Sequence, residues 1–79
     1  MRLDKYLKVS RLIKRRTAAN EACDAGKIYV NGKLARASYA VKIDDIIEIT
    51  LGSSSLKVRV SNISAAVKKE DASRMYTPV

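Results

Sequence analysis

The sequence contains no His, Trp or Phe and only one Cys, and each of these absences excludes a class of protein. Without His, and with Cys23 as the lone thiol, the chain has no cluster of side chains with the spacing of a metal site. An internal disulfide is excluded because it needs two cysteines. No nucleophile is accompanied by a His base, and no glycine-rich phosphate loop is present, so we do not predict an enzyme. We expect no cofactor.

The sequence also lacks a long apolar run. Its first residues do not form the apolar stretch of a signal peptide, and no segment reaches the length of a membrane span, so we expect a cytoplasmic protein. A chain of 79 residues suits one domain, and a domain of this size buries too little surface for a deep active-site cleft. Its core must come mainly from Leu, Ile, Val and Ala, because four Tyr are the only aromatic residues.

Apolar spacing near the amino terminus predicts two helices. Leu3, Tyr6 and Leu7 have the i, i+3, i+4 spacing of one helical face, which indicates a helix over residues 2–9. A second helix is expected over residues 16–25. Its inward side chains are expected to be Ala18, Ala19, Ala22 and Cys23, and its outward ones Asn20, Glu21 and Asp24.

After Gly26, where we expect the second helix to end, the pattern changes to that of strands. Asn31-Gly32 is the strongest two-residue signal for a hairpin. Strands are expected at residues 27–30, 33–35 and 46–51 and, as the last one, 56–63, with turns at residues 44–45 and 52–55. The predicted class is α+β, with two N-terminal helices packed on a small antiparallel β-hairpin layer. Residues 1–63 should form the domain and residues 64–79 a polar tail, with a short helical stretch around residues 69–75.

The net charge of +8 is concentrated in the first half of the chain. Residues 1–42 contain eleven Lys or Arg and three Asp or Glu, whereas residues 43–79 contain five of each sign. Seven basic residues lie within the first sixteen with only Asp4 opposing them, and such crowding is unfavourable unless a polyanion neutralises it. A solvated helix face is the alternative, but the lack of interleaved acids favours a nucleic acid. The expected RNA-binding residues are Arg2, Lys5, Lys8, Arg11, Lys14, Arg15, Arg16, Lys27 and Lys33.

Two of these candidates lie at the start of a predicted helix, and two others have an alternative structural role. Arg16 falls in the first turn of the second helix, where free N–H groups and the helix dipole attract phosphate. The residue at the expected cap is Arg15 rather than Ser, Thr, Asp or Asn. Either the cap is weak or an RNA phosphate completes it, and we favour the phosphate. For Lys27 and Lys33, a structural role beside the hairpin is an equal alternative. Tyr29, Tyr39 and Tyr76 could stack on bases, but packing in or at the edge of the core is favoured.

The order of these motifs resembles the S4 RNA-binding domain, named after protein four of the small ribosomal subunit. The resemblance rests on Arg2-Leu3-Asp4-Lys5-Tyr6-Leu7, the Lys14-Arg15-Arg16 turn, the Ala-rich helix ending at Gly26, and Ile28-Tyr29-Val30-Asn31-Gly32-Lys33. Lys42-Ile43-Asp44-Asp45 and the strand after it are similar to the usual Val-Lys-Pro-Gly-Asp segment, so about residues 2–51 are covered. This chain departs from the pattern where Ile43-Asp44 replace Pro-Gly and where Arg15 replaces a Ser or Thr cap.

Among stand-alone S4 proteins, the chain is similar to the bacterial RqcP (YabO) family of ribosome-associated quality control and to its heat-shock relatives. That resemblance implies binding to the rRNA of the large ribosomal subunit and to peptidyl-tRNA. We also expect a monomer. The resemblance also implies that an RqcH-type factor directs alanine tailing of the stalled chain, and that Arg2 and Arg16 are functional arginines. The alternatives are a heat-shock-type protein that recycles obstructed large subunits, a protein-interaction adaptor that docks through its neutral second half, and a nonspecific nucleoid protein.

Overall fold

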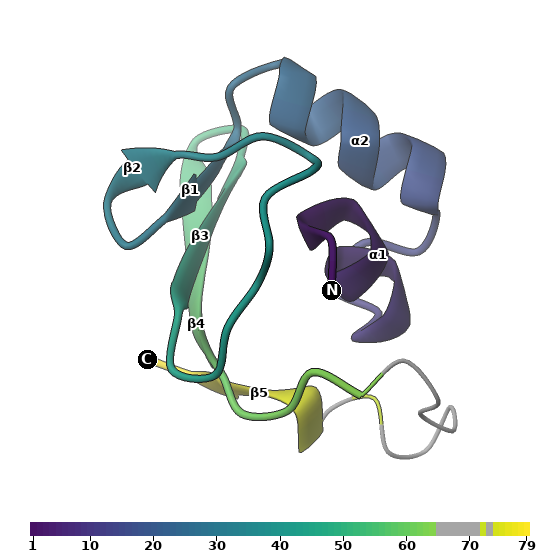
Figure 1. The fold of residues 1–79 in the computed structure, drawn as a ribbon. Helices are drawn as coiled ribbons and strands as arrows, with labels where there is room; N and C mark the ends of the chain where they lie inside the picture. The colour runs from purple at the N-terminus through teal and green to yellow at the C-terminus, as the bar shows by residue number, and fades with distance from the viewer. Residues whose placement is uncertain (65–71, 73) are drawn as a thin grey trace.

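Two helices lie on one side of an antiparallel sheet in the computed structural model, which describes residues 1–64, 72 and 74–79 (Figure 1). The elements are α1 (Leu3–Val9), α2 (Arg16–Asp24), β1 (Ile28–Val30), β2 (Lys33–Leu34), β3 (Ile46–Leu51), β4 (Ser54–Val60) and β5 (Tyr76–Pro78). Within the described residues, the sheet has five strands in the order β2-β1-β3-β4-β5, and all neighbours are antiparallel. The predicted α+β class, with two N-terminal helices on a small antiparallel sheet, is confirmed. Neither helix in this part of the chain is long and apolar enough to cross a membrane.

Alternating side chains of β3 and β4 supply the sheet's half of the core. Ile47 and Ile49 in β3 and Val58 and Val60 in β4 are buried. The polar residues that alternate with the two valines, Lys57 and Arg59, are exposed. Such a period of two places one face of each strand against the helices. The helices complete this core with Leu3, Tyr6 and Leu7 of α1 and Ala19 and Cys23 of α2.

The buried face of α2 differs from the predicted one at two positions. Ala19 and Cys23 are buried and Ala22 is half-buried, as expected. Ala18, however, is exposed, and Asn20 is half-buried and donates a hydrogen bond to the Asp4 carboxylate at 3.4 Å. The prediction that Ala18 points inward and Asn20 outward was therefore wrong, because a buried carboxylate on α1 turns a polar side chain of α2 toward it.

Residues with left-handed backbone conformation (positive φ) follow both helices and form the hairpin turn. After α1, this residue is Arg11, with a φ of 63°. After α2, Gly26 has a φ of 73°, its N–H donates to the Cys23 carbonyl, and the Lys27 N–H donates to the Ala22 carbonyl. These two bonds form a Schellman motif and confirm the predicted helix end. Asn31 and Gly32 also have positive φ, as a type I′ turn requires, so the predicted hairpin is confirmed.

The start of the chain pairs with the loop that connects β2 and β3. The Leu3 N–H donates to the Tyr39 carbonyl at 2.8 Å, and the Val41 N–H donates to the Met1 carbonyl at 2.8 Å. Between these bonds, Arg2 forms an isolated antiparallel bridge with Ala40. The backbone on which the Arg2 side chain stands is thus fixed by long-range bonds and not by α1 alone.

The carboxyl terminus supplies a strand that the sequence pattern did not predict. The prediction of residues 56–63 as the last strand was wrong, because β5 pairs with β4 and forms the edge of the sheet. Met75 is fully buried, and the Tyr6 hydroxyl donates to its carbonyl at 2.7 Å. The second turn is also shorter than predicted, because β4 begins at Ser54.

Most of the predicted helical stretch around residues 69–75 lies outside the described residues, of which Ala72, Arg74 and Met75 have 3₁₀ geometry. The predicted division between a domain of residues 1–63 and a tail of residues 64–79 stays a prediction.

Candidate nucleic-acid interface

A buried carboxylate, Asp4, holds two arginines side by side at the surface. The Arg2 guanidinium donates from Nε to Asp4 Oδ1 at 3.2 Å and from Nη2 to Oδ2 at 3.4 Å. Arg16 Nε lies 3.4 Å from Asp4 Oδ2. The Asp4 side chain is only 3% exposed, whereas the side chains of Arg2 and Arg16 are 51% and 49% exposed. Asp4 therefore fixes both guanidinium groups while leaving about half of each side chain open to a ligand. We refer to Arg2 and Arg16 as the arginine pair.

The surroundings of Asp4 favour its charged form. Burial alone would raise the pKa of this carboxyl, because a charge loses solvation when it leaves water. Hydrogen bonds from Arg2, Asn20 and Arg16 and from the Lys5 N–H, which lies 2.8 Å from Oδ1, outweigh burial and hold the pKa below its usual 3.8. The carboxylate is thus ionised at neutral pH, and each arginine meets a full negative charge.

The amino terminus of α2 adds free donors beside the arginine pair. Arg15 is the cap residue, with extended backbone, and its side chain makes no capping hydrogen bond. No acidic residue lies in the first turn of α2. The backbone N–H groups of that turn therefore receive no side-chain cap from Arg15 and no carboxylate from within the turn. Sequence and structure agree on this point.

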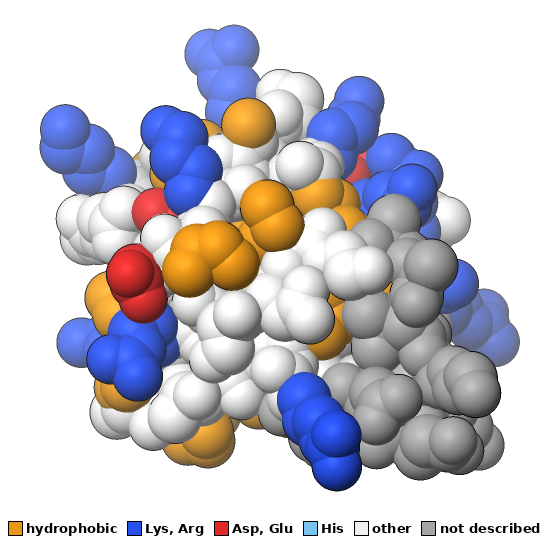
Figure 2. Space-filling model, turned by 60° about the horizontal axis from the view of Figure 1, so that its bottom comes forward, with side chains coloured by type: hydrophobic (Ala, Val, Ile, Leu, Met, Phe, Trp, Pro, Cys, Tyr) orange, Lys and Arg blue, Asp and Glu red, His pale blue; other side chains and the backbone are white. Residues whose placement is uncertain are grey.

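Most of the predicted basic residues belong to the two helices and the chain just before and between them, on one side of the sheet (Figure 1). Lys5 and Lys8 stand on α1, and Arg11, Lys14 and Arg15 lie in the connection between the helices; all are exposed except Lys5, which is half-buried. Figure 2 shows Lys and Arg side chains around the edge of one face, with few acidic side chains among them. Lys27 directly precedes β1 and Lys33 is the first residue of β2, and both are exposed.

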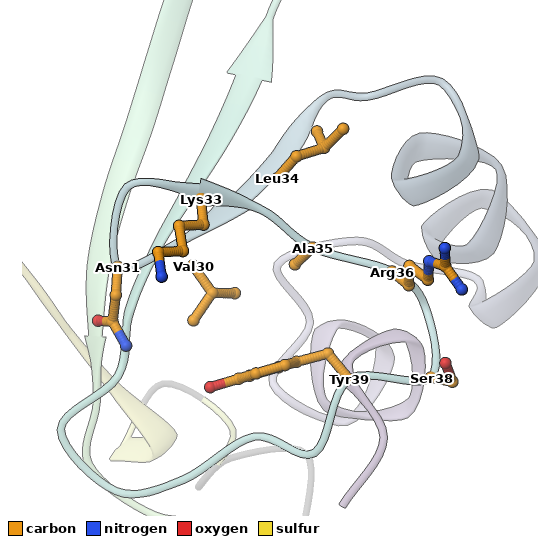
Figure 3. A pocket seen from close by; sticks show the side chains of 8 residues that line it. All are labelled: Val30, Asn31, Lys33, Leu34, Ala35, Arg36, Ser38 and Tyr39. Carbon is orange, nitrogen blue, oxygen red and sulfur yellow. The ribbon is translucent and has the colours of Figure 1, made fainter.

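Three neighbouring depressions extend from the arginine pair to the hairpin. The first contains Asp4, Arg16 and Asn20, and the second contains Asn20, Arg2 and Arg36. The third, of about 480 Å³, lies between the β1–β2 hairpin and the loop that follows it, and Figure 3 shows its lining; we call it the hairpin pocket. Arg36 lines both the second depression and the hairpin pocket, yet it was not among the predicted site residues. Its signal in the sequence was only its membership of the basic half.

A second buried carboxylate, Asp45, fixes the wall of the hairpin pocket. The Tyr39 hydroxyl donates to Asp45 Oδ2 at 2.8 Å, and Asn31 Nδ2 donates to Oδ1 at 3.0 Å. The Lys42 N–H also donates to Oδ2, at 2.9 Å. Burial acts to raise the pKa of Asp45, but these three hydrogen bonds and the Lys42 charge lower it overall. The prediction placed Asp45 in a turn and did not foresee this network.

The tyrosines and the cysteine, which the sequence also offered as candidates, are partly or fully buried in the fold. Tyr29, Tyr39 and Tyr76 are half-buried, and Tyr6 is fully buried. Cys23 is buried, and burial, with smaller contributions from Asp4 and Asp24, raises the pKa of its thiol to about 11, so it stays protonated at neutral pH. In the described part of the chain, no group of three His, Cys, Asp or Glu residues could hold a metal.

Comparison with known proteins identifies the family. The family model of the S4 domain matches residues 1–47. The RQC P-site tRNA stabilizing factor of Streptococcus pneumoniae is 55% identical over 76 residues, which cover 96% of this chain and 86% of that protein. The protein of the same name from Halalkalibacterium halodurans is 51% identical over 76 residues, with the same coverage of 96% and 86%. The solved structure of heat shock protein 15 from Vibrio cholerae, described as trimeric, has a TM-score of 0.91 at 29% identity, covering 100% of this chain and 81% of that one. This chain belongs to the S4 domain family and, within it, to the family of RQC P-site tRNA stabilizing factors.

Proposed function

We propose that this chain acts in bacterial ribosome-associated quality control by holding tRNA in the P site of the large ribosomal subunit, without chemistry of its own. The observation that carries the proposal is the arginine pair, in which a buried carboxylate presents two half-exposed guanidinium groups together. The relatives at 51–55% identity, named for stabilising P-site tRNA, support the same role. A cytoplasmic location follows from this proposal.

The geometry of the arginine pair suits RNA phosphates. Asp4 engages Nε of both arginines and only one Nη group, Nη2 of Arg2, through the bonds described above. The remaining Nη donors can form the planar, paired hydrogen bonds that guanidinium makes with phosphate. The pair thus bridges two phosphates that are close in space, as occurs where two RNA elements meet. An RNA phosphate would also complete the uncapped amino terminus of α2.

The other candidates would contribute by charge. Lys5, Lys8, Arg11, Lys14 and Arg15 surround the pair, and Lys27 and Lys33 extend the basic surface toward the hairpin. Each phosphate that they neutralise should add about 0.7 to 0.9 to the magnitude of the negative slope of log K against log salt concentration. Among the residues that the structure describes, no array of side chains for reading base edges accompanies them, so we propose that folded RNA is recognised mainly by its shape.

The proposal includes peptidyl-tRNA and large-subunit rRNA as the RNA partners and an RqcH-type tailing factor as the protein partner. In it, the chain acts as a monomer and stabilises the tRNA while that factor adds alanine to the stalled chain. The competing function is the recycling of obstructed large subunits by a heat-shock-type protein, which the fold similarity to heat shock protein 15 favours. Sequence identity favours quality control, because it is 55% to the tRNA-stabilising relative and 29% to heat shock protein 15.

Co-sedimentation with ribosomal particles from a lysate tests the proposal. The comparison is between wild type, Arg16→Ala and the matched control Arg59→Ala, which removes an exposed arginine from β4. We expect wild type and Arg59→Ala on free large subunits that carry tRNA, and at least a tenfold loss for Arg16→Ala. In cells, the same variant should lose alanine tailing. If Arg16→Ala retains both association and tailing, the role given to the arginine pair is wrong.

A further inference from the structure

The hairpin pocket combines apolar walls with positive charge (Figure 3). Leu34 lies on one side of it and is 62% exposed, although it is a large apolar side chain. The Tyr39 ring lies across from Leu34, and Lys33 and Arg36 stand at the two ends. No carboxylate is among the residues that line the pocket. Its volume of about 480 Å³ falls in the range of roughly 300 to 1,000 Å³ that is usual for small-ligand sites.

The aromatic wall of this pocket is held rigidly. Two hydrogen bonds on Asp45, from the Tyr39 hydroxyl and from Asn31, connect the loop to the hairpin turn. Asn31 is itself fixed, because its Oδ1 accepts from the Ile46 N–H at 2.9 Å. The ring of Tyr39 therefore keeps its place without a ligand, and binding to it costs little ordering of the side chain.

The hairpin pocket continues into the surface of the arginine pair. The neighbouring depression shares Leu34 and Arg36 with the pocket and includes Arg2. One acid, Asp24, also lines this depression. A polyanion bound to Arg2 can thus pass Arg36 and reach Lys33 along one connected groove. Continuity and charge both favour an RNA occupant over an apolar protein segment.

We propose that the hairpin pocket takes one unpaired nucleotide of the RNA that the arginine pair holds. Its base lies against Leu34 and Tyr39, and its phosphates are neutralised by Arg36 and Lys33. An aromatic or apolar surface accepts any base by its flat face, so the pocket selects for an unpaired nucleotide and not for a sequence. This inference rests on the proposed function, because it concerns the same RNA.

The test compares two short RNA hairpins that differ in one bulged position, which holds an adenosine in one RNA and an abasic nucleotide in the other. Affinities of the full chain are measured by fluorescence anisotropy. We expect wild type to prefer the adenosine RNA by about five- to tenfold, which is the lower part of the range for one stacked base. Leu34→Ser should abolish this preference and bind the abasic RNA like wild type. Arg36→Gln should weaken binding of both RNAs, and the matched control Arg59→Gln should leave the adenosine preference unchanged.

Each other outcome would overturn the nucleotide pocket. It is wrong if wild type binds both RNAs equally, or if Leu34→Ser keeps the preference. If Leu34→Ser binds both RNAs like wild type but no longer co-sediments with large subunits, the pocket holds a protein. Melting curves check the fold of Leu34→Ser, which we expect to be retained because Leu34 is exposed. The variant Arg16→Ala distinguishes failure of the pocket from failure of the proposed function. If the proposed function is wrong, Arg16→Ala associates with ribosomes as wild type does.

Discussion

Asp4 is the residue on which the arrangement of the arginine pair depends. In an Asp4→Asn variant, the side chain keeps its size but loses the charge that both guanidinium groups face. We expect unfolding in urea to show a loss of about 1 to 2 kcal/mol, since the hydrogen bonds are charge-assisted but the arginines are half exposed. We also expect RNA affinity to fall, as measured by anisotropy in a salt series.

The direction of that change in affinity distinguishes two explanations. Asp4→Asn raises the net charge of +8 by one, so a purely electrostatic attraction would strengthen RNA binding. Weaker binding, in contrast, means that the orientation of Arg2 and Arg16 matters more than the total charge. An Asp44→Asn variant, which changes the charge equally at an exposed position, is the control. Stronger binding by Asp4→Asn would contradict the role of Asp4 in positioning.

Arg11 combines a candidate RNA contact with an unfavourable backbone conformation. It ends α1 with a φ of 63°, and its N–H donates to the Lys8 carbonyl, at a place that glycine usually occupies. Arg11→Gly should therefore stabilise the free protein by about 0.5 to 1 kcal/mol in urea unfolding. It should also lower the magnitude of the salt slope for RNA binding by about 0.7 to 0.9 if Arg11 contacts one phosphate.

Arg11→Gln separates the two effects, because it removes the charge and keeps a side chain at positive φ. This variant should show the smaller salt slope without the gain in stability. A gain in stability for Arg11→Gln equal to that of Arg11→Gly would mean that charge repulsion, and not backbone conformation, is the source of the strain.

Local sequence patterns indicated the candidate residues but not which side chains lie close together in the fold. The density of Lys and Arg was visible in the first sixteen residues, and the position of Arg16 at the start of a helix followed from periodicity. Asp4, however, stood out only as the one acid among these basic residues, since its partners Arg16 and Asn20 are distant in sequence. Arg36 was missed for the same reason, because only the folded loop brings it to the depression that Arg2 also lines.

At the level of elements, a single hydroxyl connects α1 to the edge of the sheet. The Tyr6 O–H donates to the Met75 carbonyl just before β5, and burial raises the pKa of this tyrosine well above its usual value of 10. Tyr6→Phe removes this donor, while the Met75 carbonyl keeps the Ser61 and Asn62 N–H groups at 2.8 and 3.1 Å. We therefore expect the loss of one hydrogen bond, about 0.5 to 1.5 kcal/mol in urea unfolding.

Tyr29→Phe, at a half-buried tyrosine of β1, provides the comparison and should change stability by less than about 0.5 kcal/mol. Amide exchange should also become faster at Thr77 in Tyr6→Phe, because its strand is tied less firmly to α1. Equal stabilities of the two variants would show that the Tyr6 bond does not contribute to holding β5.

Elements with strong local signals were predictable, and those that depend on distant partners were not. The boundaries of β3 matched the prediction because Ile46–Leu51 is rich in β-branched residues between two turns. In contrast, β5 has only three residues, one of them Pro, and exists because β4 offers it a free edge. The buried face of α2 likewise depends on α1, which is why the inward position of Asn20 was not foreseen.

For the whole molecule, two of the six acids among the described residues serve to position other groups. Asp4 and Asp45 are buried and hydrogen-bonded, and Asp4 offsets part of the charge of the two arginines that it faces. The same two carboxylates organise the arginine pair and the hairpin pocket. The acids that reduce overall charge thus serve to position the groups that we propose to bind RNA.

These two carboxylates also determine how stability depends on pH. The pKa values of Asp4 and Asp45 lie below 3.8 in the folded state, so the unfolded chain binds protons first as the pH falls. Their contribution is fully present above the unfolded pKa and is lost as the pH falls through the folded values. We therefore expect the free energy of unfolding, measured with urea, to stay level between about pH 6 and 8 and to decline below about pH 4. The free energy of unfolding stays level in this pH range because the chain has no His and because the pKa of Cys23 is raised.

The control is the double variant Asp4→Asn, Asp45→Asn. It should be less stable than wild type at pH 7, and its stability should decline less steeply in acid, because neither side chain can take up a proton there. RNA affinity at pH 7 should fall in the double variant more than in Asp4→Asn alone if the hairpin pocket contributes, because Tyr39 then loses its charged acceptor. A decline in acid as steep as that of wild type would mean that other carboxylates govern the acid unfolding. In that case the two buried acids would matter for the arrangement of the surface but not for the pH range in which the protein stays folded.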